Sequence, residues 1–356
     1  MDDAVQVVGG GRERLVPGTP LLEVEDLHVE FVTRDGVAKA VNGVTYSVAA
    51  GETLAVLGES GSGKSVTAQA IMGILDMPPG RITAGRILFR GQDLLTMPSR
   101  DRRSVRGQRI AMIFQDALSA LNPVLSVGYQ LGEMFRVHQG LTRSEARDKA
   151  VALMDRVRIP AARQRVGDYP HQFSGGMRQR IMIAMALSLQ PDLIIADEPT
   201  TALDVTVQAQ VMDLLAELQS EFRMGLILIT HDLGVVADVA DKIAVMYAGR
   251  IVETAPVRDL YARPAHPYTR GLLDSIPRLD QKGRNLHAIK GLPPSLLKLP
   301  EGCAFHPRCP RAQDRCLSEA PALAPVVAED GRELPGRHSA CHYWRETLRG
   351  AETSTS

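Results

Sequence analysis

The stretch Thr53-Leu-Ala-Val-Leu-Gly-Glu-Ser-Gly-Ser-Gly-Lys-Ser65 decides how this sequence is interpreted. Its apolar first five residues predict a buried strand, and a helical pattern follows over Ser65–Leu75. The eight residues from Gly58 fit the phosphate-loop pattern G-x-x-x-x-G-K-[ST]. Glycines in such a loop let backbone N–H groups converge on phosphates at the positive end of the helix. Strand, loop and helix together therefore predict a nucleotide phosphate site.

The pattern assigns a role to the individual residues of the loop. Lys64 is expected to reach the terminal phosphates, and the Ser65 hydroxyl is expected to bind Mg²⁺. The residues expected to contact nucleotide here are Gly58, Ser60, Gly61, Ser62, Gly63, Lys64, Ser65 and Val66. The alternative is a glycine- and serine-rich turn between unrelated elements, which the flanking strand and helix disfavour.

A second apolar strand, Leu193–Ala196, ends in Asp197 and Glu198. A buried strand that delivers a carboxylate to the edge of a parallel sheet suits an acid that positions Mg²⁺ beside a phosphate loop. Asp197 is expected to hold the metal through water, and Glu198 to polarise the attacking water as a general base. Pro199 follows directly, so a simple turn is the alternative.

The wider pattern predicts an α/β protein with several parts. Strand patterns cover 22–32 and 40–48, and helix and strand patterns alternate after Phe173, which indicates a parallel sheet with helices on both faces. Thr142 and Glu145 fit a capping box that begins a helix. We expect a flexible tail at 1–20, a nucleotide-binding domain at 21–260 with a helical insert at about 116–172, and a proline-rich C-terminal domain at 261–356.

Composition excludes several classes of protein. Lys plus Arg and Asp plus Glu are both 41, so the net charge is zero and a broad nucleic-acid-binding surface is not expected. No apolar run approaches the roughly 18 residues that span a bilayer. The acidic start, Met-Asp-Asp, lacks the apolar core of a signal peptide, which predicts a cytoplasmic chain.

All four cysteines lie within the last 54 residues. Their spacing is Cys303-x5-Cys309-x6-Cys316, with Cys341 after 24 further residues. Clustered thiols in a reducing compartment favour a metal site over disulfides. The pairs C-x2-4-C of structural zinc sites are absent, as is the C-x2-C-x2-C run of bacterial ferredoxins. From spacing alone, an iron–sulfur cluster, zinc and free thiols all remain open.

At Phe173-Ser-Gly-Gly-Met177 the sequence resembles the signature motif of ATP-binding-cassette (ABC) ATPases, about 20 residues before the acidic strand. The other motifs of that family fall in order over roughly 21–260. Gln115 resembles the Q-loop glutamine, Thr201-Ala-Leu-Asp204 the D-loop and His231 the switch histidine. The resemblance implies a P-loop ABC cassette with a RecA-like core, an antiparallel β subdomain and a helical insert, followed by a small irregular C-terminal domain.

The resemblance also implies roles for residues outside the phosphate loop. Gln115 would join Asp197 and Ser65 around Mg²⁺ and act in catalysis with Glu198 and His231. Phe31 would stack on adenine, although a strand phenylalanine is core packing about as often. In the head-to-tail dimer of the family, the signature closes on the partner's nucleotide. The residues implied in that contact are Ser174, Gly175, Gly176 and Asp204.

Two segments are similar to the oligopeptide/dipeptide importer branch of the family: Tyr169–Arg180, and His266-Pro-Tyr-Thr269 with the leucines that follow. The resemblance implies an ATPase subunit that powers peptide import at the cytoplasmic face of the inner membrane. Its implied partners are a paralogous ATPase, two permeases and an external peptide-binding protein. Its implied cofactors are ATP, Mg²⁺ and a [4Fe–4S] cluster on Cys303, Cys309, Cys316 and Cys341.

Three alternatives remain at this point. A nickel or glutathione importer of the same branch would share nearly every motif. A non-transport ABC ATPase acting on ribosomes or DNA usually carries two cassettes or a long coiled-coil insert, and neither is evident in the sequence. A regulatory or iron–sulfur-assembly ATPase that bears a cluster is the third.

Overall fold

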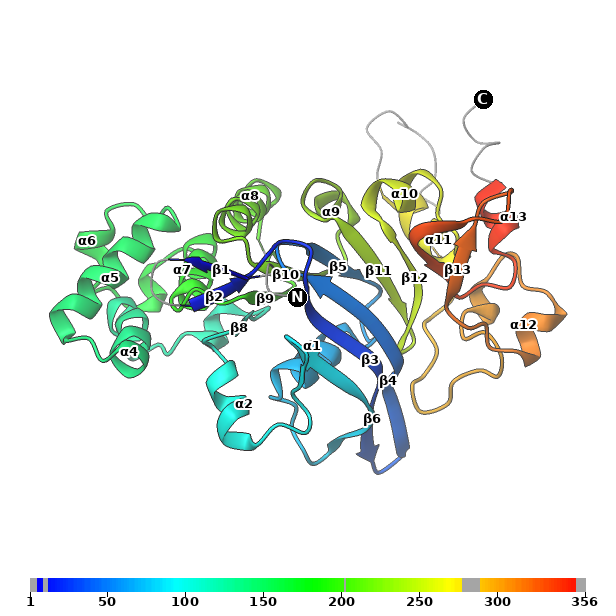
Figure 1. Cartoon of the computed structure of the whole chain (residues 1–356), viewed down its shortest axis with the longest axis horizontal. Coiled ribbons are helices and arrows are strands. Elements are labelled where there is room, and N and C mark those ends of the chain that lie inside the picture. Colours follow the sequence, from blue (N-terminus) through cyan, green and yellow to red (C-terminus); the bar gives the residue numbers. More distant parts are fainter. Residues whose placement is uncertain (1–4, 9–11, 202, 277–288, 350–356) are drawn as a thin grey trace. The chain divides into compact units, whose positions relative to one another are not determined.

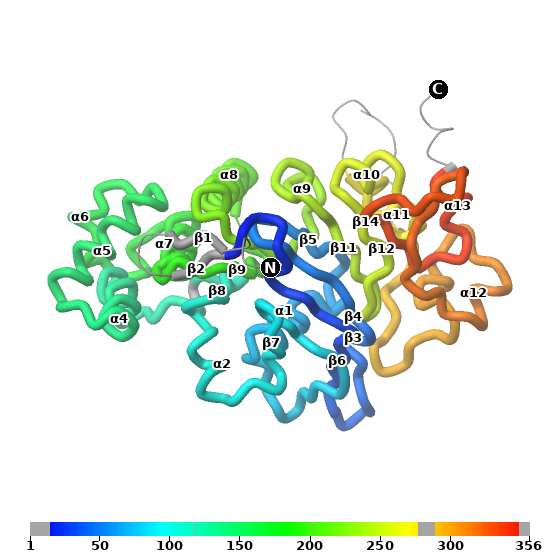
Figure 2. Tube along the Cα trace, in the orientation of Figure 1, coloured from blue at the N-terminus to red at the C-terminus, as the bar shows by residue number. Residues whose placement is uncertain are grey.

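The computed structural model describes residues 5–8, 12–201, 203–276 and 289–349 (Figure 1). The other residues include parts of the predicted tail and C-terminal domain and Ala202 of the D-loop. The chain forms two compact units: residues 1–21, 48–52 and 96–229 make the first, and residues 22–47, 53–95 and 230–356 the second. Each unit therefore draws on stretches that are far apart in sequence, as the colours of Figure 2 show.

The first unit contains a parallel sheet of strands that are buried along their whole length. The strands are β8 (Ile110–Ile113), β9 (Leu193–Asp197) and β10 (Gly225–Thr230), in the order β10-β9-β8. Their continuous apolar sequences are typical of parallel strands covered on both faces. The register pairs Ile113 with Ala196 and Asp197 with Ile229, so all three strands end at the same edge.

Helices make up most of the rest of this unit. α7 (Gly175–Leu187) packs on α8 (Val205–Phe222), and α2 (Ser99–Val105) precedes β8. Between β8 and α7 lie α3 (Ala117–Ala120), α4 (Val127–Gln139), α5 (Arg143–Arg156), α6 (Ala162–Arg165) and a 3-10 turn, η1 (Pro170–Gln172). α4 and α5 pack side by side (Figure 1). Near the N-terminus, β1 (Val5–Val8) and β2 (Arg12–Leu15) pair antiparallel.

The start of α5 shows how sequence sets a helix boundary. The Thr142 hydroxyl accepts a hydrogen bond from the Glu145 N–H at 3.4 Å, and the Glu145 carboxylate accepts one from the Thr142 N–H at 2.8 Å. These reciprocal bonds form the capping box expected from the sequence, and they satisfy two backbone donors that a helix start leaves free.

The second unit holds strands that belong to two sheets. One set has the order β13-β14-β12-β11-β5, with β5 and β11 parallel and the other pairs antiparallel. It comprises β5 (Thr53–Leu57), β11 (Lys242–Tyr247), β12 (Arg250–Pro256), β13 (Ala324–Val327) and β14 (Glu333–Ser339). The other sheet, in the order β4-β3-β6-β7, comprises β3 (Pro20–Thr33), β4 (Gly36–Ala49), β6 (Gly80–Phe89) and β7 (Gln92–Asp93).

The region beyond Leu260 contains more regular structure than its proline content suggests. Two helices of the second unit come before this region in the chain, α1 (Lys64–Met72) and α9 (Leu233–Val239), and α10 (Val257–Ala262) spans its start. Within it lie α11 (Pro267–Asp274), η2 (His306–Arg308), α12 (Asp314–Ser318) and α13 (Trp344–Arg349). Pro267 occupies the first turn of α11, where a missing N–H costs no helical hydrogen bond. β14 pairs with β12, with His338 opposite Thr254.

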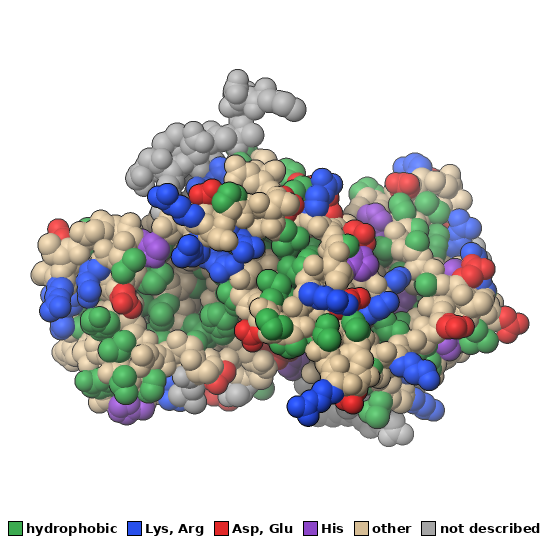
Figure 3. Space-filling view, turned by 90° about the horizontal axis from the view of Figure 1, so that it is seen from below, with side chains coloured by type: hydrophobic (Ala, Val, Ile, Leu, Met, Phe, Trp, Pro, Cys, Tyr) green, Lys and Arg blue, Asp and Glu red, His purple; other side chains and the backbone are tan. Residues whose placement is uncertain are grey.

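The surface carries charges of both signs. On the face drawn in Figure 3, Lys and Arg side chains lie in several separate groups interspersed with Asp and Glu. None of the helices in the described part of the chain has the length and apolar character that crossing a bilayer requires.

Candidate functional site

The phosphate loop lies between β5 and α1, as the sequence predicts. Gly63 precedes the first residue of α1 with φ of 106°, a backbone conformation that favours glycine. A Cβ on Gly63 would lie 2.3 Å from the Ala40 carbonyl oxygen, and one on Gly58 would lie 2.2 Å from that of Met246. Both ends of the loop are therefore packed too closely against backbone to accept any residue but glycine.

Lys64 bonds the loop that precedes it. Its Nζ donates to the carbonyl oxygens of Gly58, at 2.8 Å, and of Glu59, at 3.0 Å. The side chain is buried, so the ammonium group is held at the loop rather than in bulk solvent. The sequence prediction that Lys64 belongs to the loop site is consistent with these contacts, while its contact with phosphate stays a prediction.

The other loop residues differ in exposure. Ser60 and Gly61 are exposed, and Ser65 and Val66 are partly buried in the first turn of α1. The Ser62 Oγ is buried and has no hydrogen-bond partner among the residues that the structure describes. The exposed middle of the loop is the part that faces solvent and can approach a ligand.

Glu198 and Gln115 meet at the edge of the parallel sheet in the first unit. Each lies two residues beyond the paired strand residues Ile113 and Ala196, and the register therefore brings them together. The Gln115 Nε2 donates to Glu198 Oε2 at 2.9 Å, and the Thr201 hydroxyl donates to the same oxygen at 2.9 Å. Glu198 itself has φ of 46°, and its N–H bonds the Ile229 carbonyl at 2.8 Å.

This arrangement fixes one carboxylate oxygen and leaves the other oxygen of Glu198 outside these two bonds. Asp197, the last residue of β9, is buried.

Thr201 was not among the site residues expected from the sequence. Its signal is its position three residues after Glu198, across the turn that Pro199 begins.

His231 and Phe31 both belong to the second unit. His231 is exposed and follows the last residue of β10; the next residue, Asp232, begins α9 by accepting a bond from the Gly234 N–H at 2.9 Å. Phe31 lies in β3 opposite Gly80 of β6 and is partly exposed. The stacking of Phe31 on adenine stays a prediction.

The signature motif begins α7. The exposed Ser174 is the N-cap residue, with its hydroxyl accepting a bond from the Met177 N–H at 3.4 Å. A Cβ on Gly176 would lie 2.5 Å from a methyl of Val207, so glycine lets α7 approach α8 closely. At the start of α8, Asp204 Oδ1 accepts a bond from the Val207 N–H at 2.9 Å. Ser174 and Asp204 thus both begin helices in this unit.

Arg165 contacts the first and last residues of the signature, Phe173 and Met177. The Arg165 guanidinium lies 4.2 Å from the centre of the buried Phe173 ring, and its Nη1 is 3.5 Å from the Met177 sulfur. An arginine over an aromatic face is favourable, and the sulfur offers a weak acceptor. Phe173 and Met177 therefore hold the start of α7 against Arg165, while Ser174 and Gly175 stay exposed to solvent.

The four cysteines line one small cavity in the second unit, together with His266, His306 and His342. All four are free thiols, and the Cys303 N–H bonds the Cys316 carbonyl at 2.9 Å. Burial raises the pKa of Cys303 and Cys309, and it raises the pKa of Cys341 to about 12. Within the described residues, no three His, Cys, Asp or Glu side chains are arranged to hold a single metal ion.

Comparison with known proteins identifies the family. Residues 41–201 match the family described as ABC transporter, and residues 252–316 match the oligopeptide/dipeptide transporter C-terminal region. The oligopeptide transport ATP-binding protein OppD of Salmonella typhimurium is 52% identical over 325 residues, which cover 91% of this chain and 94% of that protein. This chain belongs to the ATP-binding proteins of the oligopeptide/dipeptide ABC transporter family.

Other relatives agree with this assignment. The dipeptide transport ATP-binding protein DppD of Bacillus subtilis is 52% identical over 83% of this chain and 88% of its own. Among solved structures, cbiO1 of Clostridium perfringens, part of the ABC transporter complex cbiONQ, is 30% identical with a TM-score of 0.58, covering 68% of this chain and 91% of its own. The ATP-binding cassette MJ0796, bound to ADP and Pi, has a TM-score of 0.60 at 24% identity, covering 67% and 99%.

These similarities confirm the predicted family, the P-loop ABC cassette fold and ATPase activity. The residues of the phosphate loop, Phe31 and His231 lie in the second unit, whereas Gln115, Asp197, Glu198, Asp204 and the signature lie in the first.

Proposed function

We propose that this ABC ATPase binds MgATP and uses its hydrolysis to drive the import of di- or oligopeptides. The observation that carries the catalytic part is the carboxylate of Glu198, held at the end of β9 by Gln115 and Thr201 through one oxygen. The match of the C-terminal region and the 52% identity to oligopeptide and dipeptide transport proteins support the substrate class.

The proposed roles follow from chemistry and position. The backbone N–H groups of the loop from Gly58 to Gly63 and the start of α1 would hold the phosphates, because a helix N-terminus favours an anion. Lys64 would leave its loop carbonyls for the terminal phosphates. Mg²⁺ prefers oxygen ligands, which Ser65, Gln115 and Asp197 offer. The ion would neutralise charge on the phosphates.

In this proposal Glu198 takes a proton from the attacking water through its second oxygen. Fixing the first oxygen by two donors orients the carboxylate before reaction, which lowers the reorganisation that catalysis requires. His231 would contact the γ-phosphate, and Phe31 would stack on adenine. The first turn of α1, with Val66, would complete the nucleotide contact.

The signature would act on a partner cassette. Ser174, Gly175 and Gly176 offer a hydroxyl and N–H groups at the start of α7, a second place where an anion is favoured. We infer that they close on ATP bound to a paralogous ATPase, with Asp204 at the same interface. At the cytoplasmic face of the inner membrane this chain would bind two integral-membrane permeases, and an external peptide-binding protein would complete the importer.

Reconstitution tests the substrate class. Proteoliposomes that contain this chain, the paralogous ATPase, the two permeases and the binding protein should accumulate labelled peptide only with ATP. The Lys64→Ala complex should not. Accumulation of nickel or glutathione without peptide would favour those alternatives. A chain that purifies without multi-span companions would overturn the importer proposal.

We further propose that the cysteine cavity holds a [4Fe–4S] cluster. Four thiols around one cavity supply the donor set, and such a cluster keeps its ligand sulfurs farther apart than a single zinc ion does. The raised thiol pKa values disfavour bare thiolates at neutral pH and would fall on metal binding. The cluster would supply a redox-active or structural centre when bound.

Anaerobic purification with iron, sulfide and zinc analysis tests the cluster directly. The proposal expects about four irons and four sulfides per chain and a broad visible absorbance near 400 nm, both reduced in Cys316→Ser. Stoichiometric zinc, or neither metal in protein isolated without oxygen, would contradict it.

A further inference from the structure

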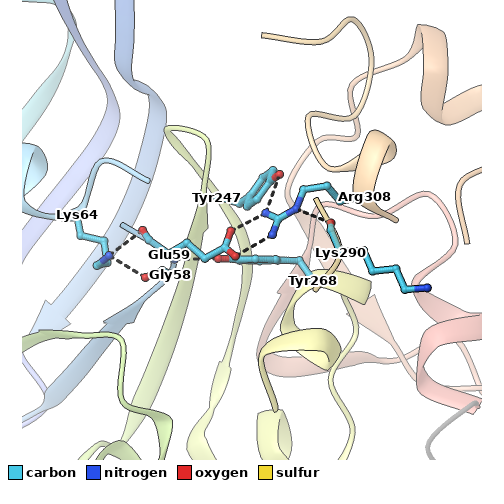
Figure 4. A network of polar contacts seen from close by, with 7 residues as sticks. All are labelled: Gly58, Glu59, Lys64, Tyr247, Tyr268, Lys290 and Arg308. Atoms are coloured by element: carbon cyan, nitrogen blue, oxygen red, sulfur yellow. Dashed lines mark hydrogen bonds and ion pairs between the residues drawn. The ribbon is translucent and has the colours of Figure 1, made fainter. Parts of the chain in front are cut away.

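The phosphate loop carries an acidic residue that is held from the C-terminal region. Glu59 is the second residue of the loop, and its carboxylate forms a two-point ion pair with Arg308 (Figure 4). The Arg308 Nη1 lies 2.6 Å from Glu59 Oε2, and Nη2 lies 2.9 Å from Oε1. The two residues are 249 positions apart, so this link is a product of tertiary structure.

Burial distinguishes this pair from an ordinary surface ion pair. The Arg308 side chain is only 4% exposed, whereas Arg315 and Arg332, which form ion pairs in the same region, are 57% and 84% exposed. Exposed pairs contribute little to stability, whereas a two-point arginine–carboxylate pair that is shielded from solvent is specific in geometry. Arg308 Nε also donates to the Lys290 carbonyl at 3.2 Å, which fixes the plane of the guanidinium.

Two tyrosines extend the same support. The Tyr268 hydroxyl accepts a bond from the Glu59 N–H at 2.9 Å, and Arg308 Nη1 lies 3.4 Å from the Tyr247 hydroxyl. The Tyr247 and Tyr268 rings pack 4.6 Å apart, and Phe305 packs on both. Glu59 is therefore held at its backbone N–H and at its carboxylate by side chains outside the loop.

The held residue also contacts the loop lysine. Lys64 donates to the Glu59 carbonyl, so the peptide group before Glu59 is held through its N–H by Tyr268 and the peptide group after it through its carbonyl by Lys64. By contrast, a Cβ on Gly61 would meet no atom within 4 Å. Within the loop, the Ser62 N–H also donates to the Glu59 carbonyl, at 3.2 Å, so the contacts that hold Glu59 bear directly on the middle of the loop.

Charge gives the pair a second consequence. ATP brings several negative charges to this loop, and a carboxylate without a partner two positions before Gly61 would repel them. Arg308 neutralises that carboxylate and fixes where it points. The loop is therefore suited to bind an anion only while Arg308 is paired with Glu59.

We propose that Arg308 is a positioning residue of the phosphate loop, which holds and neutralises Glu59 so that the loop can accept ATP. Arg308 ends the short helix η2 and directly precedes Cys309, a residue of the cysteine cavity. The same turn of chain thus contacts the nucleotide loop on one side and contributes a thiol to the cavity on the other. This inference rests on the proposed ATP binding at the loop.

A set of variants in the assembled transporter tests the role. Arg308→Ala should weaken MgATP binding on the order of 10-fold and raise KM for ATP, with kcat changed far less, because Arg308 bonds Glu59 and not a residue to which we assign a role in hydrolysis. The loss of MgATP affinity in Arg308→Ala should be smaller at high salt, since screening weakens the repulsion between an unpaired Glu59 carboxylate and the phosphates. Arg315→Ala, which removes the exposed pair with Glu319, is the matched control and should bind as wild type does.

The decisive comparison is the double variant. Adding Glu59→Gln to Arg308→Ala should restore most of the lost affinity, or at least add no further loss, because the carboxylate that needed a partner is gone. Independent, additive losses from the two substitutions would overturn the proposal. So would unchanged MgATP affinity in Arg308→Ala.

Folding and function are separated by two further measurements. Where Arg308→Ala is not recovered, Arg308→Lys keeps the charge without the two-point geometry and should show a smaller loss of affinity. Melting temperature and iron content, measured on every variant, show whether a loss reflects a damaged C-terminal region. Failure of the wild-type chain to bind MgATP would contradict the proposed function itself, whereas failure confined to these variants concerns Arg308 alone.

Discussion

Replacement of Glu198 by glutamine separates nucleotide binding from hydrolysis. Gln115 and Thr201 both donate to the same oxygen of Glu198, at 2.9 Å each. The amide oxygen of a glutamine can accept both bonds, and the amide NH2 takes the place of the second oxygen at nearly the same volume. Glu198→Gln therefore keeps these two bonds and removes the ability to accept a proton from water.

The expected magnitude follows from the loss of a general base. Such a loss lowers rates by about 10²–10⁴, which corresponds to about 3–5 kcal/mol of transition-state stabilisation. Phosphate release by the assembled transporter should fall by that factor, while MgATP affinity, measured by equilibrium dialysis, should stay within about threefold of wild type, as one retained acceptor replaces another.

A matched control comes from α8 in the same unit. Glu217 is an exposed glutamate that bonds Arg158, so Glu217→Gln makes the same chemical change away from the acidic strand. It should retain wild-type turnover, because an exposed ion pair contributes at most about 1 kcal/mol. Full turnover by Glu198→Gln, or a loss of MgATP affinity that accounts for its slower rate, would refute the assignment of Glu198.

Three further predictions concern packing, charge and capping. Gly176→Ala should lower the melting temperature, at a cost of about 1–3 kcal/mol from overpacking, because the new Cβ would lie 2.5 Å from a methyl of Val207. Gly175→Ala should not lower it, because the nearest atom to its Cβ, on Leu203, is 3.6 Å away, and equal effects of the two variants would contradict the packing argument. Burial raises the pKa of Glu253 from 4.5 to about 7, so the folded protein binds a proton there more tightly than the unfolded chain does, and wild-type stability falls as the pH rises from about 4.5 through 7. The free energy of unfolding of Glu253→Gln relative to wild type should therefore increase by about 3 kcal/mol between pH 4.5 and 7.5, and a difference that does not change with pH would disprove this prediction. Thr142→Ala should destabilise α5 by about 0.5–2 kcal/mol in thermal unfolding, and no change would show that the capping bonds are not stabilising.

Local elements could be predicted from the sequence because their causes are local. The phosphate loop follows from an apolar run, glycines at fixed spacing and a helix, and the structure has β5, the loop and α1 in that order. The α5 boundary follows from Thr142 and Glu145, which lie three residues apart. Helix α1 ends at Met72, earlier than the predicted Leu75, because the next residue, Gly73, adopts a left-handed conformation that stops the helix.

Contacts between distant parts of the chain could not be predicted in this way. Gln115 was a candidate through its place in an ordered set of motifs, but its bond to Glu198 depends on the register of β8 and β9. Nothing in the spacing of Glu59 and Arg308 indicates that they pair. Arg308 lies among prolines and cysteines, where periodicity is lost, and its partner is known only once the chain is folded.

The C-terminal region shows the same limit. Its density of proline predicts irregular chain, yet Pro256 precedes α10 and Pro267 begins α11, positions where proline is compatible with a helix. The pairing of β14 with β12 adds regular structure through partners that are 84 and 86 residues apart, Thr254 with His338 and Glu253 with Ser339. Proline content alone therefore underestimates the order of this region, because position decides whether proline disrupts structure.

The central claim is that one ATP is held between the loop of one cassette and the signature of its neighbour. The direct test is sedimentation of Glu198→Gln together with the paralogous ATPase. ATP should draw the two chains into a complex that ADP releases, and Ser174→Arg should abolish the complex while this chain still binds ATP. Sedimentation that is the same with saturating ATP and without it, in the presence of confirmed ATP binding, would contradict the claim.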